Sequence, residues 1–402
     1  MSSKTLTKSV VIAGAGHAAG QLVATLKQQR YPGRIVLIGE ESFLPYQRPP
    51  LSKKYLAGML DAERLHFKPT SFYNAANIEV HLETRIERIE PGGRRVHTDT
   101  GRSFTYDKLV LALGSRARQI PLAGAGLGGV HYLRNIPDVD NIRREIAPGR
   151  QLVIVGAGYI GLEVAAVCRE LGLDVTVVEM ADRVMSRVVA PVVSSFFQQQ
   201  HEQHGVRFLL SAGLKAIHGK ARVTAVETDN GDILPADLVI IGAGIVPNTE
   251  LAARAGLEVD DGIVVNDQCR TSDSDIYAVG DCTSHPNDIY QRRIRLESVH
   301  NALEQAKTAA GNICGNELRY CQVPWFWSDQ YDLKLQIAGL SQGFDQTIVR
   351  GNPAARKFAC LYLREGKLIA VDAVNAPHEY MQARTSIAAR EIIDPAAPAE
   401  LR

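Results

Sequence analysis

Short apolar runs along the chain alternate with longer segments in which apolar residues recur at helical spacing. Two regions have the order strand, glycine-containing turn, helix and strand, with the strands at Val10–Ala13 and Arg34–Ile38, and at Leu152–Val155 and Asp174–Val178. Their helices are expected to end near Arg30 and near Leu171. This order is typical of the βαβ unit of a doubly wound parallel sheet. Because the two units are far apart in the chain, we predict two such domains.

Further apolar runs extend the pattern toward the C-terminus. Three are expected to be strands of the same parallel sheets: Lys108–Leu113, Leu238–Ile241 and Ile276–Val279. After Pro324 the pattern changes to short alternating strands, at Leu335–Ala338, Gln346–Val349, Phe358–Leu363 and Leu368–Val371, followed by a helix near Glu379–Glu391. We predict a small C-terminal α+β domain there, and a frayed proline-rich end at Asp394–Arg402.

The turn after the first strand, Gly14 to Ala19, has the pattern G-x-G-x-x-A and opens a helix. Gly14 permits a tight turn, Gly16 lets backbone N–H groups approach a pyrophosphate, and Ala19 allows close packing of helix on strand. Glu40 comes 26 residues after Gly14, where a carboxylate can accept hydrogen bonds from ribose hydroxyls. In this context the motif predicts a dinucleotide site.

A second turn, Gly156 to Gly161, has all three glycines of G-x-G-x-x-G: Gly156, Gly158 and Gly161. Glu179 closes the following strand, 23 residues after Gly156. A carboxylate at this position accepts a hydrogen bond from a ribose 2′-OH and repels a 2′-phosphate, which favours NADH over NADPH. Arg183 nearby favours NADPH instead, although the negative charge of the neighbouring Asp182 partly offsets its positive charge. The fold expected from both motifs is α/β, with two Rossmann-like domains.

Composition narrows the class of protein. The 402 residues are 45% hydrophobic, enough to fill two or three cores, and the net charge of +1 lacks the basic excess of nucleic-acid or membrane-surface binders. The six cysteines have no CxxC, zinc or iron–sulfur spacing, so we expect no metal. Leu152–Cys168, the longest apolar stretch, includes Glu163 and three glycines and is not a membrane span; Val10–Ala13 is too short for a signal peptide. We expect a cytoplasmic protein.

Three more segments suggest that one of the two nucleotides is a flavin. Thr271–Cys282 reads T-S-D-S-D-I-Y-A-V-G-D-C and resembles the second flavin motif of the glutathione-reductase superfamily. Leu111–Gly114 and Ile241–Asn248 resemble the strand ends at which such chains pass between their FAD and NAD domains. Within that superfamily, Arg48–Lys53 (RPPLSK), Pro324–Tyr331 (PWFWSDQY) and Glu297–Ala306 are similar to the NADH-dependent ferredoxin reductases.

The resemblance implies a three-domain flavoprotein. Its FAD domain would consist of residues 1–115 and 245–322, its NAD domain of 116–244, and its C-terminal α+β domain of 323–402. Such an enzyme takes hydride from NADH onto FAD and passes single electrons to a [2Fe-2S] ferredoxin, which serves a haem mono-oxygenase or a ring-hydroxylating dioxygenase. The segment Phe43–Tyr55, where disulfide-reducing relatives carry their cysteines, has none. Reduced flavin would therefore give its electrons directly to an acceptor.

The resemblance also assigns residues to the two nucleotides. FAD contacts are expected from Gly14, Gly16, Ala18, Ala19, Glu40, Arg48, Lys53, Ile86, Arg134, Gly280, Asp281, Ser298 and Val299. NAD contacts are expected from Gly156, Gly158, Tyr159, Ile160, Gly161, Glu163, Glu179, Arg187 and Gly242. Asp281 would bind the ribityl hydroxyls, and the amides of the helix that begins after Ser298 would face the flavin C2 carbonyl.

Three residues are expected to act in catalysis. Lys53 would stabilise negative charge on reduced flavin; the alternative is an ordinary surface lysine. Glu163 would hold the nicotinamide carboxamide; the alternative is a carboxylate that complements the dipole of its helix. Trp327 would lie beside the flavin near the docking surface; the alternative, for it and Trp325, is core packing.

The expected partner is an acidic [2Fe-2S] ferredoxin, bound transiently by a monomeric enzyme. Arg292, Arg293, Arg295 and Lys307 are candidates for its docking site, or a solvated charged face. Rubredoxin reductases share these motifs, and flavoproteins like apoptosis-inducing factor are a third alternative. His201-Glu202-Gln203-His204 is not the zincin motif, because its histidines are three rather than four residues apart, and His378-Glu379 has no redox disulfide to serve.

Overall fold

The computed structural model describes residues 8–393; the predicted frayed end, Asp394–Arg402, lies outside this range. The chain forms two compact units. The first consists of residues up to Gln47, Leu65–Arg116 and Val246–Pro324, and the second of Arg48–Arg64, Ala117–Ile245 and the residues from Trp325 onward. The assignment of domains to FAD and NAD stays a prediction.

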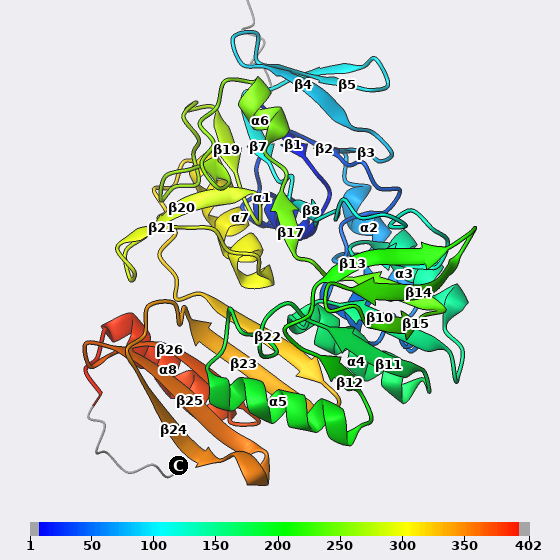
Figure 1. The fold of residues 1–402 in the computed structure, drawn as a ribbon. Helices are drawn as coiled ribbons and strands as arrows, with labels where there is room; N and C mark the ends of the chain where they lie inside the picture. The colour runs from blue at the N-terminus through cyan, green and yellow to red at the C-terminus, as the bar shows by residue number, and fades with distance from the viewer. Residues whose placement is uncertain (1–7, 394–402) are drawn as a thin grey trace, which may run out of the picture. The chain divides into compact units, whose positions relative to one another are not determined.

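The first unit is built on a five-stranded parallel sheet of order β19-β7-β1-β2-β3 (Figure 1). Its strands are β1 (Ser9–Ala13), β2 (Arg34–Ile38), β3 (Ile78–His81), β7 (Lys108–Leu111) and β19 (Ile276–Ala278). Successive residues of a strand face opposite sides. Val10 and Ile12 therefore pack with helices α1 (His17–Gln28) and α7 (Val299–Ile313), whereas Val11 and Ala13 pack toward an antiparallel meander.

That meander consists of β4 (Ile86–Glu90), β5 (Arg95–Thr98) and β6 (Ser103–Thr105). A third small sheet of this unit contains β18 (Ile263–Val264), β20 (Thr283–Asn287) and β21 (Arg292–Ile294), and the short helices are α2 (Thr70–Tyr73) and α6 (Glu250–Arg254). A two-stranded ribbon, β8 (Ser115–Ala117) with β17 (Ile245–Pro247), lies where the chain passes from one unit to the other.

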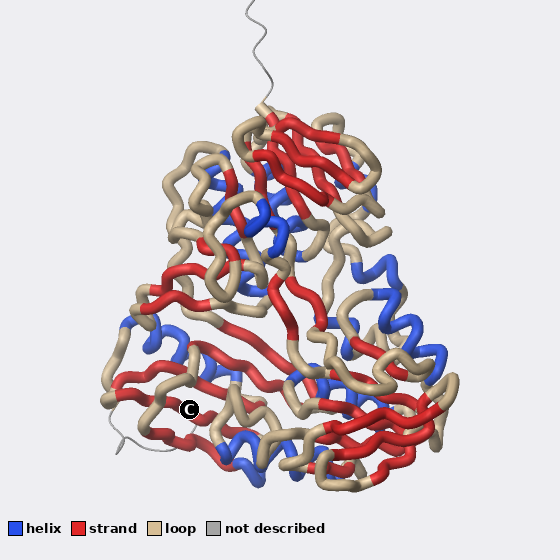
Figure 2. The backbone as a smooth tube through the Cα atoms, turned by 45° about the horizontal axis from the view of Figure 1, so that its top comes forward, coloured by secondary structure: helices blue, strands red, loops and turns tan. Residues whose placement is uncertain are grey.

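The second unit repeats the same plan and adds a further sheet. Its parallel sheet has the order β12-β11-β10-β16-β9, with β9 (Val130–Tyr132), β10 (Gln151–Val155), β11 (Asp174–Val178), β12 (Arg207–Leu209) and β16 (Leu238–Ile241). Its helices are α3 (Ile136–Glu145), α4 (Tyr159–Glu170) and α5 (Pro191–Gln203), and its meander is β13 (Leu214–Gly219), β14 (Val223–Thr228) and β15 (Ile233–Pro235). The strands of both units are red in Figure 2.

The C-terminal part of the second unit is an antiparallel sheet of order β22-β23-β26-β25-β24, packed against helix α8 (Pro377–Ala389) (Figure 1). Its strands are β22 (Trp325–Gln330), β23 (Leu333–Gly339), β24 (Gln346–Asn352), β25 (Lys357–Arg364) and β26 (Lys367–Val374). The predicted α+β domain is confirmed, although its strands are longer and its helix begins earlier than the sequence suggested. The short one-turn segment η1 (Pro49–Ser52) also belongs to this unit.

Candidate functional site

The first glycine turn leaves open space at the N-terminus of α1. Gly14 has φ of +106°, and a Cβ atom there would lie 2.2 Å from the carbonyl oxygen of Ala112, so only glycine fits. A Cβ on Gly16 would meet no atom within 4 Å. Gly16 is also the N-cap of α1, and no side chain caps that helix end. The amides and the dipole of α1 are therefore available to an anion, as a bound dinucleotide pyrophosphate requires.

The second predicted flavin segment brings Gly280 and Asp281 to the end of β19. Asp281 accepts a hydrogen bond from Ser115 Oγ at 2.7 Å, and Gly280 N–H donates to Gln305 Oε1 at 2.7 Å. Gln305 Nε2 and Asn301 Oδ1, both on α7, are buried without a hydrogen-bond partner among the described residues. Buried polar atoms are normally satisfied. These unsatisfied atoms fit a site that is completed by a bound group.

Sequence reasoning missed Gln305 and Ser115 as site residues. The only signal was that Gln305 lies one helical turn after Asn301, on the face of α7 that is buried. Ser298, which was predicted, caps α7 by accepting a hydrogen bond from Asn301 N–H at 3.1 Å. Glu40 is exposed just beyond β2, and Ile86 is buried at the start of β4. Their predicted contacts with FAD stay predictions.

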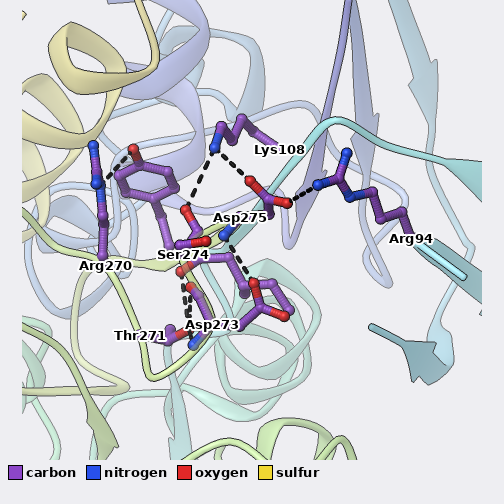
Figure 3. Close-up of polar contacts among 9 residues, drawn as sticks. Arg94, Lys108, Arg270, Thr271, Asp273, Ser274 and Asp275 are labelled. Carbon is purple, nitrogen blue, oxygen red and sulfur yellow. Dashed lines mark hydrogen bonds and ion pairs between the residues drawn. The ribbon is translucent and has the colours of Figure 1, made fainter. Parts of the chain in front are cut away.

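The turn that precedes β19 is held by a cluster of polar contacts (Figure 3). Thr271 Oγ1 accepts from Asp273 N–H at 3.2 Å, and Asp273 Oδ1 accepts from Asp275 N–H at 2.8 Å. Asp275 also pairs with Lys108 on β7, Nζ to Oδ1 2.6 Å, and with Arg94. The cluster fixes the start of the strand whose other end carries Asp281.

Asp275→Asn is expected to lower the midpoint of thermal unfolding by about 2 °C at pH 7, because solvent weakens an ion pair that is only partly buried. The hydrogen bond from Lys108 is the main reason that the pKa of Asp275 is lower than usual. The pair therefore stabilises the fold at pH values above the ordinary aspartate pKa, and this contribution is lost as the pH falls below about 4. As the pH is lowered from 7, the midpoints of thermal unfolding of the variant and the unmodified protein should converge. A difference between the two midpoints that stays constant with pH would contradict the assignment.

The second glycine turn has the same geometry in the second unit. Gly156 has φ of +101°, and a Cβ atom there would lie 2.5 Å from the Gly242 carbonyl oxygen. A Cβ on Gly158 would meet nothing within 4 Å, whereas one on Gly161 would lie 2.1 Å from the Gly156 oxygen. Gly161 therefore lets α4 pack closely on β10, and Gly158 leaves room for a pyrophosphate at the helix N-terminus.

Glu179 lies directly beside this turn. Its Oε2 accepts from Ala157 N–H at 2.7 Å, and its Oε1 accepts from Ala181 N–H at 2.9 Å. Two backbone donors thus fix the carboxylate. Arg183, which the sequence offered as a contact for a 2′-phosphate, instead donates to the carbonyl oxygens of Ser186 and Val189 at 2.7 and 2.8 Å. Its guanidinium is held by its own loop.

Glu163 is the centre of a buried polar cluster in the second unit. Only 4% of its side chain is exposed, and three side chains from two segments donate to it. Lys53 Nζ and Ser52 Oγ donate to Oε2 at 2.6 and 2.5 Å, and Ser328 Oγ on β22 donates to Oε1 at 2.7 Å. Lys53 is therefore no ordinary surface lysine. A buried carboxylate with three donors, one of them charged, is held in a fixed orientation.

The other predicted residues of this unit differ in burial and in their contacts. Arg48 donates to the Arg134 carbonyl oxygen at 2.7 Å, which brings these two predicted residues together. Trp327 is partly buried, with its ring 5.6 Å from that of Trp325. Tyr159 packs on Phe326, with ring centroids 4.9 Å apart. Ile160 and Arg187 are exposed, and their contacts with NAD stay predictions.

The predicted docking cations of the first unit are largely paired. Arg295 forms ion pairs with Asp261 at 3.0 Å and with Glu297, and Lys307 pairs with Glu304 at 2.6 Å. Arg293 donates to the Val265 carbonyl oxygen at 2.7 Å, and Arg292 is exposed. These pairs weaken the positive field that the four cations would otherwise present. The docking role of the cluster stays a prediction.

Within residues 8–393 no helix is long and apolar enough to cross a membrane, and no group of histidine, cysteine, aspartate or glutamate side chains is arranged to hold a metal ion. His201, from the motif set aside as a zinc site, is fully buried and bonded to Gln330. The described cysteines are unpaired, and most are buried.

The chain belongs to the pyridine nucleotide-disulphide oxidoreductase family, whose sequence profile matches residues 8–306. Residues 325–401 match the profile of a reductase C-terminal domain. Membership implies FAD and a pyridine nucleotide as cofactors. A ferredoxin--NAD(P)(+) reductase from Sphingomonas sp. is 45% identical over 392 residues, which cover 96% of this chain and 94% of the relative.

Two solved structures are similar over nearly the whole length. Putidaredoxin reductase, in a covalent complex with putidaredoxin, has a TM-score of 0.94 and 42% identity, with 96% of this chain and 94% of that chain covered. The ferredoxin reductase for the CYP199A2 system from Rhodopseudomonas palustris has a TM-score of 0.95 and 42% identity, with 98% of both chains covered. The predicted fold class and the predicted class of oxidoreductase are confirmed.

Proposed function

We propose that this chain is an FAD-dependent NADH:ferredoxin reductase. It would serve a [2Fe-2S] ferredoxin that supplies a haem mono-oxygenase or a ring-hydroxylating dioxygenase. The observation that carries the proposal is the nearly full-length likeness to reductases of this kind, one of them solved in covalent complex with putidaredoxin. The lack of cysteine in Phe43–Tyr55 also supports it, because without a thiol relay the reduced flavin passes its electrons directly to an acceptor.

The residues of the first unit bind FAD in this proposal. The amides that follow Gly16 bind the pyrophosphate, Glu40 accepts from ribose hydroxyls, and Asp281 accepts from ribityl hydroxyls. Gly14, Ala18 and Ala19 shape the turn and the packing of α1, and the α7 amides after Ser298 and Val299 carry a positive dipole end. When bound, FAD supplies the conversion of a two-electron hydride into two single electrons.

The residues of the second unit bind NADH and assist the transfer. Gly158 admits the pyrophosphate, and Glu179 accepts from the ribose 2′-OH. Glu163 orients the nicotinamide carboxamide, and the Lys53 ammonium stabilises developing negative charge. Arg48 and Arg134 add charge for the FAD nucleotide. Because Glu179 is fixed by two backbone amides and Arg183 is held by its loop, a 2′-phosphate would be repelled by the Glu179 carboxylate without help from Arg183.

The partner in this proposal is an acidic [2Fe-2S] ferredoxin that a monomeric enzyme binds transiently. Its docking site consists of Arg292, Arg293, Arg295 and Lys307, all of which except Arg295 are exposed. The unpaired and mostly buried thiols support a reducing compartment, the cytoplasm.

The test mixes FAD-loaded protein anaerobically with NADH or NADPH, follows the visible flavin absorbance, and then adds a [2Fe-2S] ferredoxin or a rubredoxin. We expect rapid bleaching by NADH, slow bleaching by NADPH, and recovery that depends on the ferredoxin. In Glu179→Gln, removal of the repelling charge should narrow the preference for NADH by about tenfold. Recovery only with rubredoxin would move the assignment to a rubredoxin reductase, and no recovery with either acceptor would contradict an electron-transfer role.

A further inference from the structure

The buried cluster around Glu163 continues along one face of strand β22. Alternate residues of a strand share a face, so Phe326, Ser328 and Gln330 point to the same side. Phe326 packs on Tyr159, and Ser328 bonds to Glu163 four residues further along α4. Gln330 is next in the row. Ser328 is fully buried, and only 1% of Gln330 is exposed.

Hydrogen bonds link this row to helix α5. Gln330 Nε2 lies 3.1 Å from Ser328 Oγ, and Gln330 Oε1 lies 2.8 Å from His201 Nε2. His201 Nδ1 lies 3.2 Å from the hydroxyl of Tyr331. His201 has no exposed surface, and its ring packs edge-on against Phe208. Four hydrogen bonds thus run in series from Tyr331 to the carboxylate of Glu163.

The chemistry of the groups fixes the direction of every bond in this series. An ionised carboxylate only accepts, so Ser328 donates to Glu163 and must accept from the amide NH₂ of Gln330. The Gln330 carbonyl then accepts from His201, which must carry its proton on Nε2. Burial lowers the pKa of His201 to about 4, so the ring is neutral near pH 7 and its Nδ1 can accept from Tyr331. All four donors point toward Glu163.

We propose that Ser328, Gln330 and His201 are positioning residues that hold the Glu163 carboxylate oriented for the nicotinamide. The proposal rests on the function proposed above for Glu163. Aligned hydrogen bonds polarise one another, so the series adds a positive potential at the carboxylate. It does not conduct protons, because the Gln330 carboxamide has no readily transferable proton. Lys53 and Ser52 fix one carboxylate oxygen, and the series fixes the other.

The first test is the protonation of His201, which can be measured without turnover. Nitrogen-15 histidine spectra of the FAD-loaded protein, assigned with His201→Gln, should show the Nε2–H tautomer and no titration between pH 5 and pH 9. A proton on Nδ1, or a charged ring near pH 7, would reverse a bond in the series and overturn the proposal.

The second test removes the series one group at a time. Ser328→Ala deletes the donor to Glu163, and Gln330→Leu deletes the donor to Ser328. Thr228→Val is the matched control, because it also removes a buried hydroxyl of the second unit, on β14, away from the series. NAD⁺ affinity is measured by calorimetry, and flavin reduction by NADH is measured by stopped flow.

In Ser328→Ala we expect flavin reduction to slow about tenfold, the loss that one hydrogen bond to a charged group represents. NAD⁺ affinity should fall much less than the rate of flavin reduction, because the series orients the carboxylate at the nicotinamide and leaves the pyrophosphate and ribose contacts unchanged. Gln330→Leu should show smaller changes of the same kind, and Thr228→Val none. A rate of flavin reduction that is unchanged in both variants, or that falls equally in the control, would overturn the proposal.

Glu163→Gln separates this proposal from the function on which it rests. If Glu163→Gln impairs NAD⁺ binding and flavin reduction while Ser328→Ala does not, the series is only structural and the assignment of Glu163 stands. If Glu163→Gln itself changes neither, the role proposed for Glu163 is wrong, and the positioning role of the series falls with it.

Discussion

Lys53→Met is expected to lower the free energy of unfolding by about 3 kcal/mol and to slow flavin reduction by NADH about a hundredfold. The loss of stability follows because the variant leaves the Glu163 carboxylate buried with two hydroxyl donors and no positive charge. The loss of rate follows because no cation then offsets the negative charge that develops on reduction. Denaturation can be followed by tryptophan fluorescence, since both tryptophans, Trp325 and Trp327, belong to the same unit as this pair.

The double variant Lys53→Met with Glu163→Gln separates stability from chemistry. It removes both charges and keeps the shape of the Glu163 side chain, so most of the lost stability should return. Flavin reduction should stay slow, because neither group can perform its proposed role. If the losses of stability in the two single variants simply add, the charges do not act as a pair; a double variant with restored activity would refute both catalytic roles.

Gly16→Val and Gly158→Val are each expected to weaken the binding of one nucleotide strongly and to leave the binding of the other intact. Both glycines have negative φ, −88° and −78°, and a Cβ atom on either would meet nothing within 4 Å, so valine can be accommodated in the folded protein. Each side chain would fill the space at one helix N-terminus. Gly16→Val should therefore lose FAD, with at least about a hundredfold weaker affinity, whereas Gly158→Val should retain FAD and lose NAD⁺ to a similar extent.

Flavin content after incubation with FAD and calorimetry with NAD⁺ measure these two effects, and circular dichroism checks the fold. Gly14→Ala serves as the contrasting variant, because its Cβ would lie 2.2 Å from a carbonyl oxygen at a φ of +106°. We expect it to fold poorly rather than to bind selectively. Loss of both nucleotides from either valine variant, in a folded protein, would contradict the assignment of one turn to each nucleotide.

Much of this fold was predictable because its strands are strongly apolar and its turns are marked by glycine. The runs at Val10–Ala13 and Leu152–Val155 are short, continuously apolar and followed by glycine turns, as buried strands of a parallel sheet are. The meanders β4–β6 and β13–β15 were not predicted, since their strands mix buried and exposed positions without a continuous apolar run. In β4, Glu87, Arg88 and Glu90 are charged and exposed, and in β14 the two buried valines are three residues apart. The predicted strand Lys108–Leu113 ends at Leu111, because the chain there must turn beside Gly14.

Site residues were predictable where the local backbone geometry permits only one residue type. They were not predictable where their contacts depend on tertiary packing. Gly14 and Gly156 fall in the first group, because their turns need a positive φ. Ser52 and Ser328 fall in the second group: a serine carries no signal that it will donate to a carboxylate more than a hundred residues away. The pairing of Arg295 with Asp261 was hidden for the same reason, and the sequence offered Arg295 as an available cation.

The sheet of the first unit has a consequence for the order in which the chain can fold during synthesis. Strands β1, β2, β3 and β7 come from the first 111 residues, but the edge strand β19 begins at Ile276. Until the ribosome has made that strand, one edge of β7 has no hydrogen-bonding partner. The other parallel sheet consists of β9, β10, β11, β12 and β16, and all five strands have been synthesised once the chain reaches Ile241. The parallel sheet of the second unit can therefore form completely before β19 of the first unit has been synthesised. During that time the unpaired edge of β7 is open to hydrogen bonding with strands of other chains, which would lead to aggregation.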